Sequence, residues 1–296
     1  MLLKKRISVT YFLNLIKYDI IAIAAYAILA GTFDHSWLLK EVSIPLPVSS
    51  FVGTLLSLLL AFRTSQSYQI WWEARTIWGG IVNDSRTLIR QVQQFFPKTT
   101  EGAEKVTTFA EQQILWCYAL SENLRKLPFT GIVADYVSTH KVQTNNLPNL
   151  ILNKHAELLA NASEEFQLDA NKQVQIDSTI ARLCDAMGKC ERLKNTVFPR
   201  SYSVLVHFLI YVLMTLLPFG LEDKSKFVEI TLTFAIPVLF IAIERTAILM
   251  QDPFENKPTD TPMTTLSRTI ESNLREMMGQ PSFPVQPAQP DSYYIM

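Results

Sequence analysis

The sequence predicts an all-α membrane protein in which membrane-crossing helices join a helical region in the cytosol. Two observations predict this class. The apolar residues are concentrated in four segments. The polar stretches between those segments repeat apolar residues at a spacing of three or four, which is the period of an amphipathic helix. No alternating pattern typical of strands competes with this prediction.

The four apolar segments differ in length. Ile44–Phe62 and Tyr202–Leu221 reach the roughly 20 residues that a spanning helix needs. Ile20–Phe33 and Ile230–Ile243 are shorter, and they reach that length only if flanking charges such as Asp19 lie near an interface. Buried helices of a large soluble core are the alternative, but charge-free runs of this length are rare in soluble chains. We therefore expect two membrane hairpins, with four transmembrane helices per subunit.

The positive charges predict which side of the membrane each part occupies. Basic residues flank the outer ends of the two hairpins: Lys4, Lys5, Arg6, Lys17, Arg63, Arg200 and Arg245. The two short loops inside the hairpins contain only Lys40, Lys224 and Lys226. By the positive-inside rule, the long polar middle and both termini are cytoplasmic. The N-terminus has no small-residue cleavage site, so we expect it to be retained in a multi-pass protein of the cell (inner) membrane.

These patterns divide the chain into five parts. They are an N-terminal segment with the first hairpin (1–62), a cytosolic helical region (63–201), the second hairpin (202–250), a cytosolic C-terminal helix (251–279) and a flexible tail (280–296). In the C-terminal helix we expect Thr261 as the N-cap, Pro262 at the first helical position and Gly279 at the end. The tail contains four prolines and no apolar period.

The sequence does not predict an enzyme. It contains no P-loop, GxGxxG, GxSxG or HExxH motif, and the four histidines are scattered. His207 lies within an apolar segment, where a buried hydrogen-bonding role is more common than a ligand role. Cys117, Cys184 and Cys190 lack metal-like spacing and are odd in number, which favours reduced thiols. We expect no cofactor and no metal. The balance of 27 basic and 27 acidic residues gives no reason to expect nucleic acid.

The second apolar segment continues without Gly or Pro from Thr54 to Trp78. A helix over these residues is about 37 Å long, so it projects beyond a hydrocarbon core of about 30 Å. It carries a row of small residues, at Ser57, Ala61 and Ser65, and beside it a row at Thr54, Leu58 and Phe62. The small residues allow close helix packing. The second row either lines a hydrophobic constriction between several copies of the chain or takes part in ordinary hairpin packing.

Three stretches of the sequence resemble the bacterial bestrophins. They are "AFRTSQSYQIWWEARTIWG", "CERLKNTVFPRSYSVLVHFLIYVLMTLLPFGL" and "DPFENKPTDTPMTTLSRTIESNLREMMGQ", and they occur in the order typical of that family. The resemblance covers roughly residues 5 to 280. It implies a homopentamer around a central pore, four membrane helices per subunit and a cytosolic helical vestibule. It also implies that the second membrane helix lines a narrow neck.

The resemblance further implies functional positions. The neck residues would be Thr54, Leu58 and Phe62, with Thr54 replacing the usual aliphatic side chain. A second constriction at the cytosolic exit would fall near Asn171, where a ring of Lys172 side chains would favour anions. Eukaryotic members bind calcium in an acidic cluster after the fourth helix. Here that cluster keeps Asp252, Glu255 and Asp260 but includes Lys257 and Pro258, so we expect no calcium gating.

The resulting hypothesis is a passive channel for small monovalent ions, either chloride or sodium and potassium. Its partners would be further copies of itself, membrane lipids and the conducted ions. A membrane-anchored scaffold whose cytosolic helices bind a partner protein is the alternative. A transporter is a third possibility, although charged residues able to couple a substrate are scarce within the apolar segments.

Overall fold

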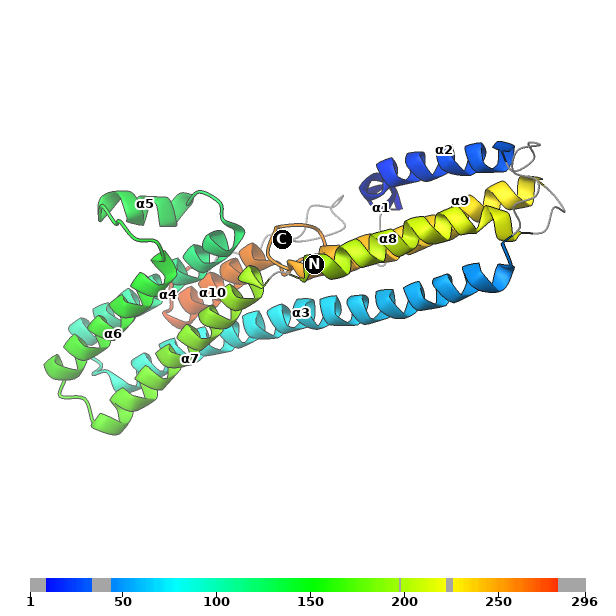
Figure 1. Ribbon diagram of the computed structural model, residues 1–296. Coiled ribbons are helices and arrows are strands. Elements are labelled where there is room, and N and C mark those ends of the chain that lie inside the picture. Colours follow the sequence, from blue (N-terminus) through cyan, green and yellow to red (C-terminus); the bar gives the residue numbers. More distant parts are fainter. Residues whose placement is uncertain (1–8, 34–43, 197, 222–225, 282–296) are drawn as a thin grey trace. The chain divides into compact units, whose positions relative to one another are not determined.

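The computed structural model describes residues 9–33, 44–196, 198–221 and 226–281 (Figure 1). Every regular element within these ranges is a helix, as the sequence predicted. The elements are α1 (Val9–Leu15), α2 (Lys17–Phe33), α3 (Leu46–Phe95), α4 (Thr100–Arg125), α5 (Gly131–Thr139), α6 (Leu147–Glu165), α7 (Ala170–Asn195), α8 (Arg200–Leu216), the 3₁₀ turn η1 (Pro218–Gly220), α9 (Lys226–Gln251) and α10 (Met263–Met277). The predicted hairpin loops and most of the C-terminal tail lie outside the described residues.

The chain divides into two compact units. The apolar unit comprises Arg6–Ile70 and Val197–Gln251, and the polar unit contains Trp71–Thr196 and the chain from Asp252 onward. The apolar unit thus holds α1, α2, α8, α9 and the first half of α3. Its core is built from aliphatic side chains of these helices and of the bend between α1 and α2, at Ile16, Ile23, Leu56, Leu60, Val206, Leu209, Ile210, Leu213 and Ile241.

The polar unit is a bundle in which α4 packs on α6 and α10, and α6 packs on α7. Large side chains of α3 and α4, among them Trp78, Phe109 and Trp116, are fully buried in it. Its helices have defined ends. Thr99 caps α4 by accepting a hydrogen bond from the Gly102 amide at 3.2 Å, and Lys126 ends that helix in the left-handed conformation, at φ 56°. The bundle therefore has its own core and its own helix boundaries.

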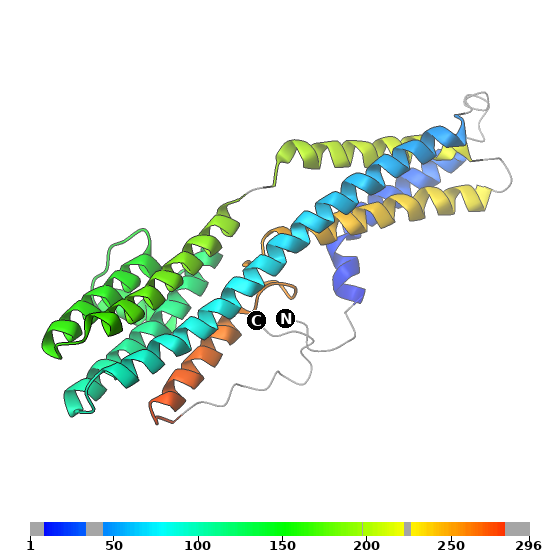
Figure 2. The ribbon, with the colours of Figure 1, turned by 90° about the horizontal axis from the view of Figure 1, so that it is seen from below.

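Helix α3 is 50 residues long and belongs to both units. Figures 1 and 2 show it as one unbroken ribbon. Its buried residues recur every seven positions, at Leu60, Ser67, Ala74, Ile81 and Leu88, and none of these is more than 1% exposed. On another side of the helix, exposed residues recur with the same period, at Val48, Leu55, Phe62, Gln69, Thr76, Asn83 and Arg90.

This helix extends further than the sequence reasoning expected, because it passes through Gly79 and Gly80 to Phe95. Each glycine costs a helix about 1 kcal/mol relative to alanine. The side chains that follow, Ile81, Leu88 and Ile89, are all fully buried. Their burial contributes roughly 1.5–3 kcal/mol apiece, which outweighs the cost of the glycines.

Within the described ranges, two helices are long and apolar enough to cross a membrane. They are α3 and the stretch Phe227–Gln251 of α9, and α7 with α8 would form a third if that bent pair is taken as one span. Helices α2 and α8 have 17 residues each, which is the lower limit for a spanning helix. Each of the four predicted apolar segments is therefore helical, and α9 is extended in both directions beyond Ile230–Ile243.

The predicted start of the C-terminal helix was wrong by one residue. Helix α10 begins at Met263, so its N-cap residue is Pro262. The Thr261 hydroxyl therefore does not cap the helix. The Thr261 amide instead donates to the Pro253 carbonyl at 3.0 Å, and the Thr261 carbonyl accepts from the Met263 amide at 2.8 Å. These bonds hold Thr261 in the preceding loop. The predicted end is confirmed, since Gly279 follows the helix with φ 70°.

Candidate functional site

The predicted neck residues lie on the exposed side of α3 in the apolar unit. Leu58 is 68% exposed and Phe62 is 55% exposed, and Thr54 is exposed as well. Leu56 and Leu60, which lie on the opposite side of the helix, are at most 1% exposed. The apolar unit therefore leaves this row of side chains without a covering helix of its own.

The row of small residues shares the exposed half of α3. Ser57, Ala61 and Ser65 are all exposed. The Ser57 hydroxyl donates to the Gly53 carbonyl at 2.7 Å, and the Thr54 hydroxyl donates to the Ser50 carbonyl at 2.8 Å. Each hydroxyl proton is thus used within the helix, while the oxygen still offers a lone pair outward. An exposed half that mixes small, polar and aromatic residues is suited to contact with protein or water rather than with lipid alone.

Two aromatic side chains from the start of the second hairpin support the row at Phe62. Tyr202 donates its hydroxyl to the Leu59 carbonyl of α3 at 2.6 Å. Its ring lies 6.3 Å from the Phe62 ring and 5.3 Å from the Phe198 ring, measured between centroids. The Tyr202 bond fastens α8 to α3 at the level of the predicted neck. This contact, between residues 143 apart in the sequence, had no sequence signal.

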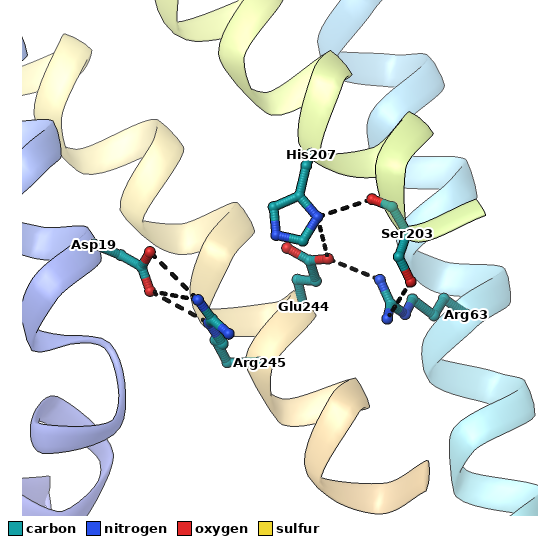
Figure 3. A network of polar contacts seen from close by, with 6 residues as sticks. All are labelled: Asp19, Arg63, Ser203, His207, Glu244 and Arg245. Carbon is teal, nitrogen blue, oxygen red and sulfur yellow. Dashed lines mark hydrogen bonds and ion pairs between the residues drawn. The ribbon is translucent and has the colours of Figure 1, made fainter. Parts of the chain in front are cut away.

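Directly after Phe62, the chain places an arginine on the buried side of α3. The Arg63 guanidinium donates to Glu244 Oε1 of α9 at 2.7 Å and to the Ser203 hydroxyl of α8 at 3.0 Å (Figure 3). The side chains of Arg63 and Glu244 are only 2% and 1% exposed. A buried ion pair between three helices is costly to break. Sequence reasoning used Arg63 only as a membrane-flanking charge and missed its partner.

His207 of α8 lies beside this pair. Its Nδ1 is 2.8 Å from the Ser203 carbonyl and 3.3 Å from Glu244 Oε1. The predicted hydrogen-bonding role is thus confirmed. The predicted burial was wrong, because the side chain is 39% exposed. A second ion pair joins α2 to α9, with Arg245 Nη2 3.1 Å from Asp19 Oδ2 (Figure 3). That pair is more open, at 37% and 28% exposure.

The predicted aperture residues lie at the beginning of α7 in the polar unit. Asn171 and Lys172 are exposed. Asp169 caps the helix by accepting from the Asn171 amide at 3.0 Å. The Lys172 ammonium lies 5.8 Å from the centroid of the Phe95 ring, a cation–π contact with the end of α3. Val174, two residues further on, is 65% exposed and is an aliphatic side chain that the sequence reasoning did not consider.

The acidic loop between α9 and α10 pairs its carboxylates within the protein. Asp252 accepts from Lys194 Nζ at 2.6 Å, and Glu255 forms an ion pair with Lys257. Asp260 accepts from the Lys257 amide at 2.9 Å. Among the described residues, no group of three His, Cys, Asp or Glu side chains is arranged to hold a metal ion. Lys194 and Lys257 therefore neutralise the carboxylates that a bound metal ion would otherwise neutralise.

Burial raises the pKa of Asp260 from 3.8 to about 6, since the 2% exposed carboxylate is desolvated. A carboxyl group whose folded-state pKa is raised contributes stability below its unfolded value, and this contribution is lost as pH rises through about 6. We therefore expect Asp260→Asn to raise the thermal denaturation midpoint above about pH 7 and to have little effect near pH 4. The control is Asp177→Asn, which makes the same chemical change at an exposed position. A constant Asp260→Asn effect from pH 4 to 8 would contradict the assignment.

Three buried titratable groups of the polar unit are inert. Burial raises the pKa of the Cys117 and Cys190 thiols to about 12 and lowers that of His155 to about 4. All three cysteines are free, as predicted. Thiols that stay protonated and an imidazole that stays neutral are suited to packing rather than to nucleophilic or acid–base catalysis.

Comparisons with known proteins agree with this architecture. A family model described as Bacterial/Fungal Bestrophin protein matches residues 8–276. The voltage-dependent anion channel-forming protein RSc3414 of Ralstonia nicotianae is 31% identical over 251 residues, which is 83% of this chain and 81% of that protein. YneE of Escherichia coli K12, which carries the same description, is 28% identical over 249 residues, 83% of this chain and 80% of that protein. A crystal structure of a bacterial bestrophin homolog from Klebsiella pneumoniae has a TM-score of 0.82 and 25% identity, covering 91% of this chain and 100% of the other.

Proposed function

Since the chain belongs to the bacterial and fungal bestrophin family, we propose that it forms a passive channel for small monovalent ions, gated by a hydrophobic neck. The relatives described as voltage-dependent anion channel-forming proteins support anions as the first candidates. Sodium and potassium remain the competing ions, and the charge of the neck surroundings decides between them.

The observation that carries this proposal is the uncovered row on α3. Leu58 and Phe62 are more than half exposed, on a helix whose other side is buried in its own unit. If this apolar row faced lipid, the polar residues Ser57 and Ser65 would not be expected in the row beside it. In a ring of five subunits the same row faces a central axis, and the small residues allow neighbouring helices to approach closely. Hydrophobic constrictions of this kind gate by excluding water.

The exposed positions that follow Phe62 also support a pore-lining helix. At intervals of seven residues they are Gln69, Thr76, Asn83 and Arg90, so the exposed row changes from apolar to polar along α3. A pathway that leads from a membrane into a water-filled vestibule requires that change. In this proposal α2, α3, α8 and α9 cross the inner membrane, and the polar unit with both termini lies in the cytosol.

The first test is ion flux through purified protein in liposomes. We expect a salt gradient to give a current whose reversal potential departs from zero, because the neck discriminates between ions of opposite charge. Chemical crosslinking of the detergent-solubilised protein should give a pentamer. A monomer, or liposomes that stay impermeable, would contradict the channel and would favour a scaffold function.

We further expect the channel to be insensitive to calcium. Lys194 and Lys257 already pair with Asp252 and Glu255, so a calcium ion would have to displace two ammonium groups. It would also lack the six to eight oxygen ligands that it prefers. Flux through reconstituted protein should therefore be the same with added calcium as with a chelator. A change in flux between these two conditions would refute this expectation.

A further inference from the structure

The pair formed by Arg63 and Glu244 is shielded from water. Besides the contacts already described, the guanidinium carbon of Arg63 lies 5.1 Å from the centroid of the Phe198 ring. Arg63 Nε and Glu244 Oε2 are buried and have no hydrogen-bond partner within the described part of the chain. Charges in such surroundings are not screened by mobile ions, so their field extends further than that of a surface pair.

The position of this pair brings its field close to the ion pathway. Arg63 is the residue next to Phe62, and consecutive Cα atoms are about 3.8 Å apart. Phe62 lies on the exposed side of α3, whereas Arg63 lies on the buried side. Only the thickness of one helix therefore separates the pair from the neck. A charge at that distance, across low-dielectric protein, changes the energy of an ion in the neck.

His207 adds a hydrogen-bonding side chain to this group. Its Nδ1 lies within reach of two acceptors, the Ser203 carbonyl and Glu244 Oε1. Arg245, the residue after Glu244 on α9, pairs with Asp19 of α2 instead (Figure 3).

We propose that the buried pair of Arg63 and Glu244 sets the preference of the neck for anions or cations. The proposal rests on the proposed function, because it requires an ion pathway beside Phe62. The opposite charges balance in the intact pair, and loss of either partner leaves one unbalanced charge per subunit. Five unbalanced charges of one sign around one axis favour ions of the opposite sign.

The test compares reversal potentials of the wild type and its variants in a potassium chloride gradient. His207→Gln leaves both charges of the pair in place and keeps a hydrogen-bonding side chain beside Glu244. Its ratio of chloride to potassium permeability should therefore stay close to that of the wild type.

Substitutions within the ion pair separate an electrostatic role from a structural one. Glu244→Gln leaves the charge of Arg63 unpaired and should raise the ratio of chloride to potassium permeability at least about threefold, whereas Arg63→Met leaves the charge of Glu244 unpaired and should lower the ratio by about as much. A defect of folding or packing would move both variants in the same direction. Asp19→Asn is the matched control, because it breaks the more exposed pair with Arg245 and should leave the ratio close to that of the wild type.

The outcomes distinguish the two proposals. Wild-type protein that passes no ions overturns the proposed function. Wild-type protein that conducts, with a permeability ratio that does not respond to these substitutions, overturns the role of the ion pair alone. If the two single variants elute as aggregates in size-exclusion chromatography, the double variant Arg63→Met with Glu244→Leu decides. It removes both charges and should keep the wild-type ratio, and a different ratio would overturn the proposal.

Discussion

Replacing Phe62 with alanine is expected to raise the ion flux through reconstituted protein by about tenfold or more, which corresponds to lowering the barrier by ~1.4 kcal/mol. The ring is more than half exposed, on the row that would face the pore, and removing it would widen the neck and admit water. Leu58→Ala should act in the same direction, because Leu58 lies one turn away on the same row. Single-channel conductance in planar bilayers provides the measurement.

Phe208→Ala is the matched control for this experiment. Phe208 is 60% exposed, close to the exposure of Phe62, but it lies on α8 rather than on the predicted neck row. Its removal deletes the same number of atoms and should leave the conductance unchanged. Equal increases in both variants, or no increase in Phe62→Ala, would mean that the row does not line the pathway.

Replacing Glu244 with alanine is expected to destabilise the protein by about 3–5 kcal/mol, because it leaves the Arg63 charge buried and unpaired. Asp19→Ala removes the acidic partner of a pair that is about one-third exposed, and should cost less than about 1 kcal/mol. Thermal denaturation of both variants in detergent checks this difference. The double substitution Arg63→Met with Glu244→Leu should recover most of the loss, since it removes both charges from the interior. Similar midpoints for the two single variants would contradict the burial of the pair.

The sequence predicted those parts of the fold that depend on local patterns. The helices follow from the three- and four-residue spacing of apolar side chains. The end of α10 shortly before Gly279 follows from a residue that tolerates positive φ. The start of that helix was misplaced because Thr261 and Pro262 form an acceptable cap by themselves. Only the contact with Pro253 places Thr261 in the loop.

The candidate site was predictable to the extent that it lies on one helix. Spacing and the family resemblance selected Thr54, Leu58 and Phe62, and the structure leaves all three exposed, although their role in conduction stays a prediction. The ion pair behind them joins residues 181 positions apart. No local pattern indicates such a partner, because a single charge at the end of an apolar segment is ordinary. The aperture also stays a prediction, since Asn171 and Lys172 were reached by counting along α7.

The seven-residue period of α3 has a consequence for how such a channel could open. A straight helix drifts by about 20° over each seven residues, so a row repeating at that interval stays on one side only if the helix winds left-handed around its neighbours. Five copies that keep Phe62 and Gln69 toward one axis would form a left-handed supercoil. Relaxing that winding would tilt all five copies of α3 together and would widen the pore at every level of the row. The pore radius would then depend on the pitch of the supercoil as well as on the size of the side chains that line the pore.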